Sequence, residues 1–260
     1  MTLCIVQARM SSSRLPGKVL KPVLGKPLIG HLLERIRRSS EINKIIVAIP
    51  DEPGDNELNL YLQNYGCQVF RGSREDVLDR YYQTARLCNP ALIVRLTGDC
   101  PLIDPEISDA TIRHYKSKDF DYVSNTLRRP VYPKGLDTEV FSLAALETAW
   151  KEAVLPSERE HVTPFLYKHP ERFKIGCLQP LEDYSGERWT VDHAEDFTLI
   201  EKILQHFYPE RPCFGMQDIL EFKKQNPALF EINQHIPRDE GYLRSLQKDE
   251  SYLRGQSPKK

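Results

Sequence analysis

Short apolar runs alternate with amphipathic segments over the first two-thirds of the chain. The apolar runs predict strands over 3–8, 44–49, 67–70 and 91–96. Between them, apolar residues recur at helical spacing, which predicts helices over 28–39, 55–65 and 75–88. Because buried strands separated by helices form parallel sheets, this pattern predicts an α/β fold with helices on both faces of the sheet.

The pattern is more mixed after residue 105. It predicts, in order, a helix over 105–118, strands over 121–124 and 137–141, helical stretches over 142–153 and 157–168, strands over 173–178 and 188–191, and a helix over 194–206. From about residue 209 it predicts two proline-punctuated helical pieces and a frayed Lys- and Gln-rich end. We therefore expect one main domain over 1–208 and a helical C-terminal extension over 209–260.

Composition narrows the function classes. A net charge of -1 argues against a general nucleic-acid surface, and 40% hydrophobic content supports a full core. The six cysteines are scattered without CxxC pairs, which favours a reduced, cytoplasmic setting. No apolar run reaches the length of a membrane helix, and the first strand begins directly after Met1, so we expect no signal peptide and no membrane partner.

The loop after the first strand carries most of the positive charge of its region. Through Leu33 there are five Lys or Arg residues and no acid, and three of the five cations, Arg9, Arg14 and Lys18, lie in one turn-rich stretch. Ligands of parallel sheets bind at the carboxyl ends of the strands, where backbone amides and cations can face phosphate. The loop therefore predicts a triphosphate site.

Two carboxylates follow other strands. Asp99 comes just after the strand at 91–96, and Asp192 follows the apolar run at 188–191. Each has a structural alternative: Asp99 could shape its turn or cap a helix, and Asp192 could cap the helix at 194 with Glu195 completing a capping box. Asp104, directly before Pro105, is the better cap for the helix at 105. If Asp99 and Asp192 meet, they could hold one Mg²⁺ with the phosphates.

Eight motifs in order, spread over residues 3–245, carry a resemblance to a known family. They are Gln7-Ala-Arg-Met-Ser-Ser-Ser-Arg-Leu-Pro-Gly-Lys18, Gly25-Lys-Pro-Leu28, Val69-Phe-Arg-Gly-Ser73, Asp76-Val-Leu-Asp-Arg80, Leu96-Thr-Gly-Asp-Cys-Pro101, Gly135-Leu-Asp-Thr-Glu-Val140, Glu158-Arg-Glu-His-Val-Thr163 and Trp189-Thr-Val-Asp192. The chain resembles the cytidylyltransferases that make CMP-activated acidic sugars, which include the CMP-Kdo and CMP-sialic acid synthetases. It looks most similar to the spore coat polysaccharide biosynthesis type.

The resemblance implies a Rossmann-like nucleotidyltransferase fold, with a mixed, mostly parallel sheet flanked by helices. It implies a nucleotide site, with Mg²⁺ on Asp99 and Asp192 and with Lys18, Arg14 and Asp99 as the catalytic set. The implied nucleotide-binding residues are Ala8, Arg9, Ser13, Arg14, Lys18, Arg71 at the cytosine, and Thr97. The sialic acid and Kdo enzymes carry other residues where this chain has Thr97, and the Kdo enzymes have Thr-Pro at His193-Ala194, so the acceptor sugar stays open.

A second group of charged residues predicts the acceptor side. The polar loop 125–135 is rich in cations, and a predicted strand follows it with Asp137 and Glu139 two residues apart on one face. Cations such as Lys134 suit an anionic acceptor, and the acids could hold its hydroxyls. The family match adds Glu160 and His161. The structural alternatives are a surface hairpin for the loop and a solvated helix face for Glu160 and His161.

The expected reaction transfers CMP from CTP to an acidic sugar or phosphorylated acceptor and releases pyrophosphate, for surface polysaccharide or glycan biosynthesis. The expected partners are CTP and a small anionic acceptor, and a homodimer stays open. Three alternatives remain: another nucleotide or a non-sugar acceptor, a non-catalytic binding module, and a glycosyltransferase whose metal site would be the D-x-D of Asp119-Phe120-Asp121. The third is weaker because these acids precede a predicted strand instead of following one.

Overall fold

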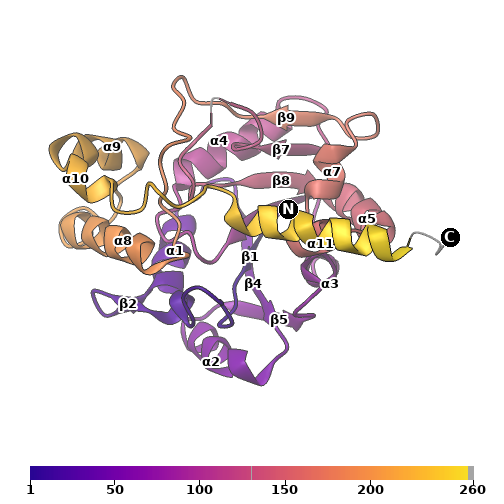
Figure 1. Ribbon diagram of the computed structural model, residues 1–260, viewed down its shortest axis with the longest axis horizontal. Coiled ribbons are helices and arrows are strands. Elements are labelled where there is room, and N and C mark those ends of the chain that lie inside the picture. The colour runs from indigo at the N-terminus through magenta and orange to yellow at the C-terminus, as the bar shows by residue number, and fades with distance from the viewer. Residues whose placement is uncertain (130, 257–260) are drawn as a thin grey trace.

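A seven-stranded sheet runs through the middle of the molecule, which is a computed structural model that describes residues 1–129 and 131–256 (Figure 1). Its strand order is β5-β4-β1-β6-β8-β7-β9. The strands are β1 (Thr2–Gln7), β4 (Lys44–Pro50), β5 (Gln68–Gly72), β6 (Leu92–Thr97), β7 (Tyr122–Ser124), β8 (Glu139–Ser142) and β9 (Ile175–Cys177). A separate antiparallel pair consists of β2 (Pro22–Val23) and β3 (Lys26–Pro27).

One strand of the large sheet, β8, runs opposite to the other six. Strands β5, β4, β1 and β6 are all parallel, with Ile5 opposite Ile46 on one side and Arg95 on the other. Strand β8 pairs antiparallel with both β6 and β7, and β9 is parallel to β7. The predicted mixed, mostly parallel sheet is confirmed. The carboxyl ends of the four parallel strands share one edge, which we call the rim.

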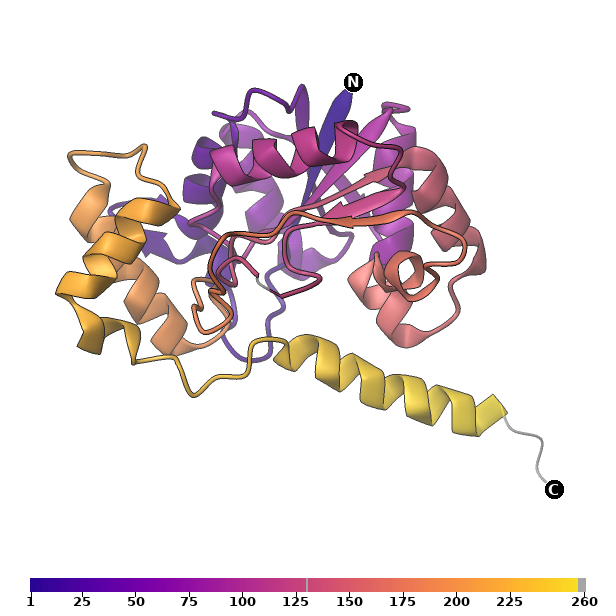
Figure 2. The same ribbon diagram turned by 90° about the horizontal axis from the view of Figure 1, so that it is seen from above.

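Helices cover both faces of the sheet, and further helices lie beside it (Figure 2). They are α1 (Leu28–Ile36), α2 (Asn56–Asn64), α3 (Val77–Arg86), α4 (Pro105–Lys116), α5 (Leu143–Glu152), α6 (Pro156–His161), α7 (Pro164–Lys168), α8 (Ala194–Phe207), α9 (Met216–Gln225), α10 (Pro227–Phe230) and α11 (Glu240–Gln256), with short 3-10 turns η1 (Lys18–Leu20) and η2 (Pro53–Asp55).

The core follows the alternation of side chains along each strand. In β1, Leu3 and Ile5 belong to a core shared with α3, α5 and α7. Cys4 and Val6 point to the other face and belong to a core shared with α1, α2 and α4. A continuous apolar strand is therefore buried on both sides, as the sequence pattern predicts for a parallel sheet.

A third core lies beside the sheet, where α8, α9 and α10 form a lobe (Figure 2). Trp189 and Val191 pack in this core together with Ile200 of α8 and Ile219 of α9. Residues on both sides of position 208, the expected domain boundary, thus share one set of apolar contacts.

Three local expectations need correction. The predicted helix over 157–168 is two helices, because Val162 between them has a φ of 72°. The predicted strand over 188–191 is a single bridge from Lys134 to Arg188, since this segment bonds first to Lys134 and then, through Val191 N, to Asp99 O. Within residues 209–256 there are three helices in place of two, and α11 extends to Gln256. The expected frayed end therefore falls on residues 257–260, outside the described residues.

Candidate functional site

The loop after β1, which we call the first loop (residues 8–17), is shaped by two glycines. Gly17 has a φ of 68°, a conformation that favours glycine, and its N–H donates to the carbonyl of Met10 at 3.0 Å. Gly98 lies so close to β1 that an added Cβ would be 2.8 Å from the Cβ of Ala8. Gly17 starts the η1 turn at Lys18, and Gly98 lets the ends of β1 and β6 meet.

The ammonium of Lys18 contacts two carboxylates and one carbonyl of the site. Its Nζ donates to Asp99 Oδ2 at 2.9 Å, to Asp192 Oδ1 at 2.8 Å and to the carbonyl of Val191 at 2.7 Å. The side chain is buried, with 7% of the residue exposed. The structure therefore brings together two carboxylates, those of Asp99 and Asp192, that lie 93 positions apart in the chain.

Asp192 is oriented by two arginines. Its Oδ1 lies 2.6 Å from Nη2 of Arg14, and its Oδ2 lies 3.3 Å from Nη2 of Arg188. The capping alternative for Asp192 is wrong: His193 is the N-cap of α8, and Asp196 accepts its backbone N–H at 3.0 Å. Asp196, not Glu195, completes that box because it is the residue three positions after the cap. The carboxylate of Asp192 is thus available for the site.

The expectation for Asp104 is confirmed. Its side chain caps α4 by accepting the backbone N–H of Glu106 at 2.9 Å. Asp99 has no capping role there and faces Lys18 instead.

Charge balance explains the electrostatics of this cluster. Burial alone would lower the pKa of Lys18, but Asp99 and Asp192 outweigh it and raise that pKa above its ordinary value. Burial would raise the pKa of Asp192, yet Lys18 and Arg14 hold that pKa well below the usual range. Asp99 also has a lowered pKa, because Lys18 outweighs burial and the nearby Asp192. Both carboxylates are therefore ionised at neutral pH and able to hold a cation.

The other residues predicted to bind nucleotide surround this cluster at different depths. Arg9 and Ser13 of the first loop are exposed. Ala8 is buried and donates its N–H to Ala48 O at 3.2 Å, and Thr97 Oγ1 lies 3.2 Å from Cys100 Sγ. Arg9 and Ser13 can thus reach a ligand from solvent, whereas Ala8 and Thr97 shape the floor of the rim.

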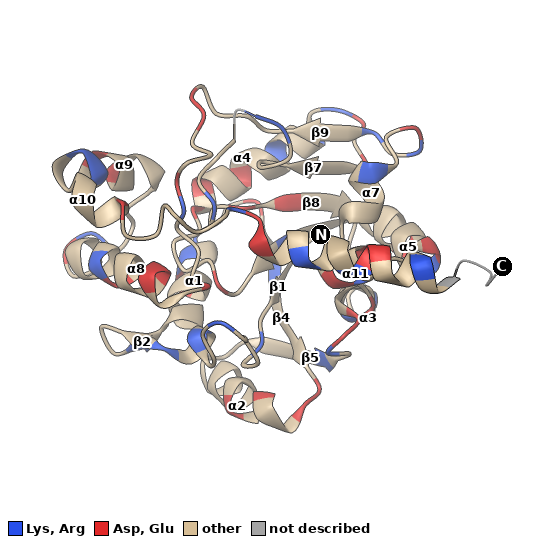
Figure 3. Cartoon of the chain, in the orientation of Figure 1, with Lys and Arg blue, Asp and Glu red and all other residues tan. Residues whose placement is uncertain are grey.

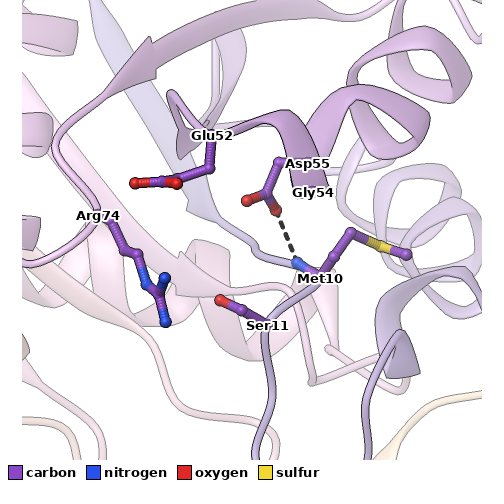
Figure 4. A pocket seen from close by; sticks show the side chains of 6 residues that line it. All are labelled: Met10, Ser11, Glu52, Gly54, Asp55 and Arg74. Carbon is purple, nitrogen blue, oxygen red and sulfur yellow. Dashed lines mark hydrogen bonds between the residues drawn. The ribbon is translucent and has the colours of Figure 1, made fainter.

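A hollow of about 300 Å³ lies between the first loop and η2 (Figure 4). Its lining residues are Met10, Ser11, Glu52, Gly54, Asp55 and Arg74. Asp55, only 2% exposed, accepts the N–H of Met10 at 2.7 Å and so fixes the first loop to η2.

Arg71 lies behind one wall of this hollow. Its guanidinium donates to the carbonyl of Glu52 at 2.9 Å and to Asn56 Oδ1 at 2.7 Å, and it pairs with Asp51 at 3.0 Å. In this arrangement Arg71 braces Glu52, which lines the hollow.

Among the predicted acceptor residues, Lys134 and Asp137 form one pair. Lys134 Nζ lies 3.2 Å from Asp137 Oδ1, and Asp137 Oδ2 accepts the N–H of Gly135 at 2.7 Å. The carbonyl of Lys134 accepts the N–H of Trp189 at 2.6 Å, which ties this loop to the segment that leads to Asp192. The loop that carries Lys134 therefore contacts the segment that carries Asp192.

Glu139 occupies a buried polar network. Strand β8 begins at Glu139, so Asp137 is not on the same strand face as the sequence pattern predicts. The carboxylate of Glu139 pairs with Arg95 and accepts hydrogen bonds from the hydroxyls of Tyr122, at 2.6 Å, and Thr163. All of these partners come from within the fold, which gives Glu139 a structural task.

Glu160 and His161 face α11. The hydroxyl of Ser245 donates to Glu160 Oε2 at 2.9 Å and lies 2.9 Å from His161 Nε2. The ring of Tyr242 meets the His161 ring edge-on, with centroids 5.2 Å apart. Burial lowers the pKa of His161 to about 4, so the imidazole is neutral at neutral pH.

The D-x-D of the glycosyltransferase alternative lies away from this site. Asp119 pairs with Lys174, and Asp121 accepts the N–H of Lys174 at 2.8 Å. Because β7 runs in the same direction as β6, the residues just before β7 lie at the edge opposite the rim.

Residues that the sequence analysis missed hold the site in shape. They are Asp55, Arg188, Asp196, Glu240 and Ser245. For Asp196, the position three residues after the start of a helix was a usable signal. For the two residues of α11, Glu240 and Ser245, no local pattern in the sequence links them to the rim.

Two features of the described part of the chain bear on its partners. No group of three or more His, Cys, Asp or Glu side chains there could hold a metal ion, so an ion on Asp99 and Asp192 would need further ligands from substrate or water. No helix in residues 1–129 and 131–256 is long and apolar enough to cross a membrane.

Comparison with known proteins identifies relatives of this chain. SpsF, the spore coat polysaccharide biosynthesis protein of Bacillus subtilis, is 33% identical over 234 residues, which cover 86% of this chain and 95% of SpsF. A cytidylyltransferase from Leptospira borgpetersenii superposes with a TM-score of 0.83 at 33% identity and covers 88% of this chain and 96% of that chain.

A more distant structure shares the fold. The synthetase of CMP-2-keto-3-deoxy-manno-octonic acid, solved with CTP, gives a TM-score of 0.62 at 16% identity, over 79% of this chain and 98% of that chain. The Rossmann-like nucleotidyltransferase fold is thereby confirmed. The family model described as cytidylyltransferase matches residues 3–236, from β1 through the third core. This chain therefore belongs to the cytidylyltransferase family of enzymes.

Proposed function

We propose that this protein transfers CMP from CTP to an acidic sugar, with release of pyrophosphate, in a reaction that depends on Mg²⁺ and serves the assembly of a surface polysaccharide. The observation that carries the proposal is the convergence of Asp99 and Asp192 on Lys18 beside the cation-rich first loop. Two ionised carboxylates next to a phosphate site have the donor chemistry that Mg²⁺ takes in proteins.

The ammonium of Lys18 supports the metal assignment. The two carboxylates already enclose one cation, so they can accommodate another when CTP brings its phosphates. Asp99 and Asp192 would hold the ion, which supplies charge neutralisation at the reacting phosphates. Lys18 and Arg14, released from the carboxylates, would then face the β- and γ-phosphates.

The bond changes follow from this placement. A hydroxyl oxygen of the acceptor attacks the α-phosphorus and its proton passes to solvent, while the bond from the α-phosphorus to the α–β bridging oxygen breaks and pyrophosphate leaves with the electron pair. Pre-placed cations stabilise that charge as it develops, which is the main task of a protein in phosphoryl transfer. Arg14 and Lys18 are the candidates for this task.

The remaining substrate contacts are assigned by position. The hollow beside the first loop is the proposed site of the cytosine, with Arg71 bracing its wall. The acceptor side is proposed to consist of Lys134, Asp137, Glu160 and His161, whereas Glu139 is occupied by Arg95, Tyr122 and Thr163 within the fold. The structural relative named for CMP-2-keto-3-deoxy-manno-octonic acid supports a sugar acid as acceptor, and the spore coat relative supports a role in polysaccharide biosynthesis.

The test is pyrophosphate release from CTP, UTP, GTP and ATP against a panel of acceptors. The panel contains 3-deoxy-manno-octulosonate, N-acetylneuraminate, other sugar acids and sugar phosphates, each with Mg²⁺ and with the ion removed by chelator. We expect turnover with CTP, a sugar acid and Mg²⁺ together. Comparable rates with UTP would reject the cytosine assignment, and turnover restricted to sugar phosphates would reject the acidic-sugar assignment.

A further inference from the structure

The C-terminal helix α11 lies across the acceptor side, on a segment that the family model, which ends at residue 236, does not include (Figure 1). It is reached through a connection rich in turns, residues 231–239, after α10 (Figure 2). It packs on α6, and its first residues are acidic (Figure 3). Its position raises the question of what an appended helix does over a substrate site.

The acidic start of the helix pairs with cations of the proposed site. Asp239 Oδ1 lies 3.4 Å from Nζ of Lys134, and Glu240 Oε2 lies 3.8 Å from Nε of Arg14. Glu240 also contacts Nε2 of His193 at 2.9 Å, next to Asp192. Two carboxylates of the chain itself therefore stand beside cations proposed for substrate anions.

One turn further along, the helix presents a hydroxyl. Ser245 is 1% exposed, and its Oγ lies between Glu160 and His161 at 2.9 Å from each. A hydroxyl between a carboxylate and a neutral imidazole is the arrangement that would hold a sugar hydroxyl.

The most deeply buried side chains of α11 are polar, and the half-buried Tyr242 also packs edge-on against the His161 ring. Over residues 240–255 the buried side chains are Ser245 and Asp249, and Asp249 accepts hydrogen bonds from the backbone N–H of Ser157 at 2.8 Å and from its hydroxyl at 2.6 Å. Leu243 remains 53% exposed. Polar contacts exchange readily for contacts with water, so undocking this helix costs less than undocking an apolar one.

We propose that α11, together with Asp239 just before it, is an internal mimic of the acceptor: the carboxylate of Asp239 and the hydroxyl of Ser245 occupy the acceptor side, and a hydroxylated sugar acid must displace the helix to bind. This inference rests on the proposed function, since it takes Lys134, Glu160 and His161 as acceptor-side residues. It makes docking of α11 and binding of the acceptor mutually exclusive.

The sharpest kinetic test removes the mimicking hydroxyl. Ser245→Ala should lower the KM for the sugar acid about three- to tenfold, the size of a lost hydrogen bond, with the KM for CTP nearly unchanged. Ser251→Ala is the matched control, because both hydroxyls bond the carbonyl four residues earlier in the same helix and Ser251 is exposed. An acceptor KM that is unchanged or raised in Ser245→Ala would overturn the proposal.

Hydrogen exchange of the full-length protein gives a readout that does not need turnover. Amides of 241–256 should exchange faster when a sugar acid from the panel is added to the CTP and Mg²⁺ complex. Slower exchange would show a lid that closes on the acceptor, and unchanged exchange would show a fixed wall; either overturns the proposal. If no acid yields pyrophosphate, the proposed function fails, and the exchange data alone then decide whether these acids displace α11.

Discussion

The proposed nucleotide side and the proposed acceptor side of this protein use the same kinds of charged residue in different ways. On the nucleotide side, Asp99 and Asp192 share Lys18, and their side chains are 25% and 20% exposed. On the acceptor side, Glu139 and Arg95 pair at about half that exposure, with 10% and 12%. The first group can exchange partners with a ligand, whereas the second holds β6 and β8 together.

This difference teaches that a charge near the rim is not by itself a ligand contact. A carboxylate that pairs with a neighbouring cation at the rim can release it when phosphate arrives. A carboxylate that already pairs with an arginine and two hydroxyls has its hydrogen bonds satisfied. Removing those partners leaves a buried charge unpaired and costs its full desolvation penalty. The following predictions test this distinction, from the largest effect to the smallest.

Removing the buried carboxylate should cost stability first. Glu139→Ala leaves Arg95 without its partner, so we expect a loss of about 3–5 kcal/mol in the free energy of unfolding. Urea unfolding of the variant and of wild type measures it. A variant with wild-type stability and a raised acceptor KM would instead place Glu139 among the acceptor contacts.

Removing a rim carboxylate should cost activity instead. Asp99→Asn keeps the shape of the side chain but weakens its hold on a cation, so kcat should fall at least about 10²-fold while the circular dichroism stays that of wild type. Asp119→Asn is the control, because that acid belongs to the D-x-D at the far edge. If the control loses as much activity as Asp99→Asn, the glycosyltransferase alternative gains support.

Lys18 should distinguish the triphosphate from the monophosphate. Lys18→Ala removes a charged donor proposed to contact the β- and γ-phosphates, so the Kd for CTP should rise about 10- to 100-fold. The Kd for CMP, which lacks those phosphates, should change much less. Calorimetric titration with both nucleotides measures this, with Lys21→Ala as the control, whose ammonium lies over the Phe197 ring. Equal losses for CTP and CMP would reject the assignment.

Lys134 should affect only the acceptor. Lys134→Ala removes a cation proposed to face the anionic group, so we expect the acceptor KM to rise about fivefold with the KM for CTP within a factor of two. Steady-state kinetics in each substrate separates the two constants. A change in the KM for CTP alone would move Lys134 to the nucleotide side.

His161 should make stability depend on pH. Its pKa in the folded protein, about 4, is below the ordinary 6.5, so the unfolded chain binds more protons between these values. Stability should therefore fall as pH drops through that window, by about 1 kcal/mol between pH 6.5 and 5.5. Urea unfolding of His161→Gln at both pH values should lack this part of the loss, while exposed His235→Gln retains it. Equal pH dependence in both variants would contradict it.

The sequence by itself determined the parallel half of the fold. Strands β1, β4 and β6 are buried on both faces of the sheet. A strand buried on both faces needs apolar side chains at successive positions, so it shows in the sequence as an apolar run. The same logic located the first loop and Asp99, because the carboxyl ends of parallel strands share one edge. Asp104 as a helix cap also followed from local chemistry, since its partners are two and three residues away.

Only the tertiary structure decided how distant parts meet. The 188–191 segment is apolar like a strand, but its backbone partners are Lys134 and Asp99, so packing in the third core overrode the local pattern. The placement of α11 depended on partners some 85 positions away, as with Ser245 and Glu160. Its two buried side chains are a serine and an aspartate, and because hydrogen bonds to partners so far along the chain leave no local pattern, the target of the helix could not be predicted from the sequence.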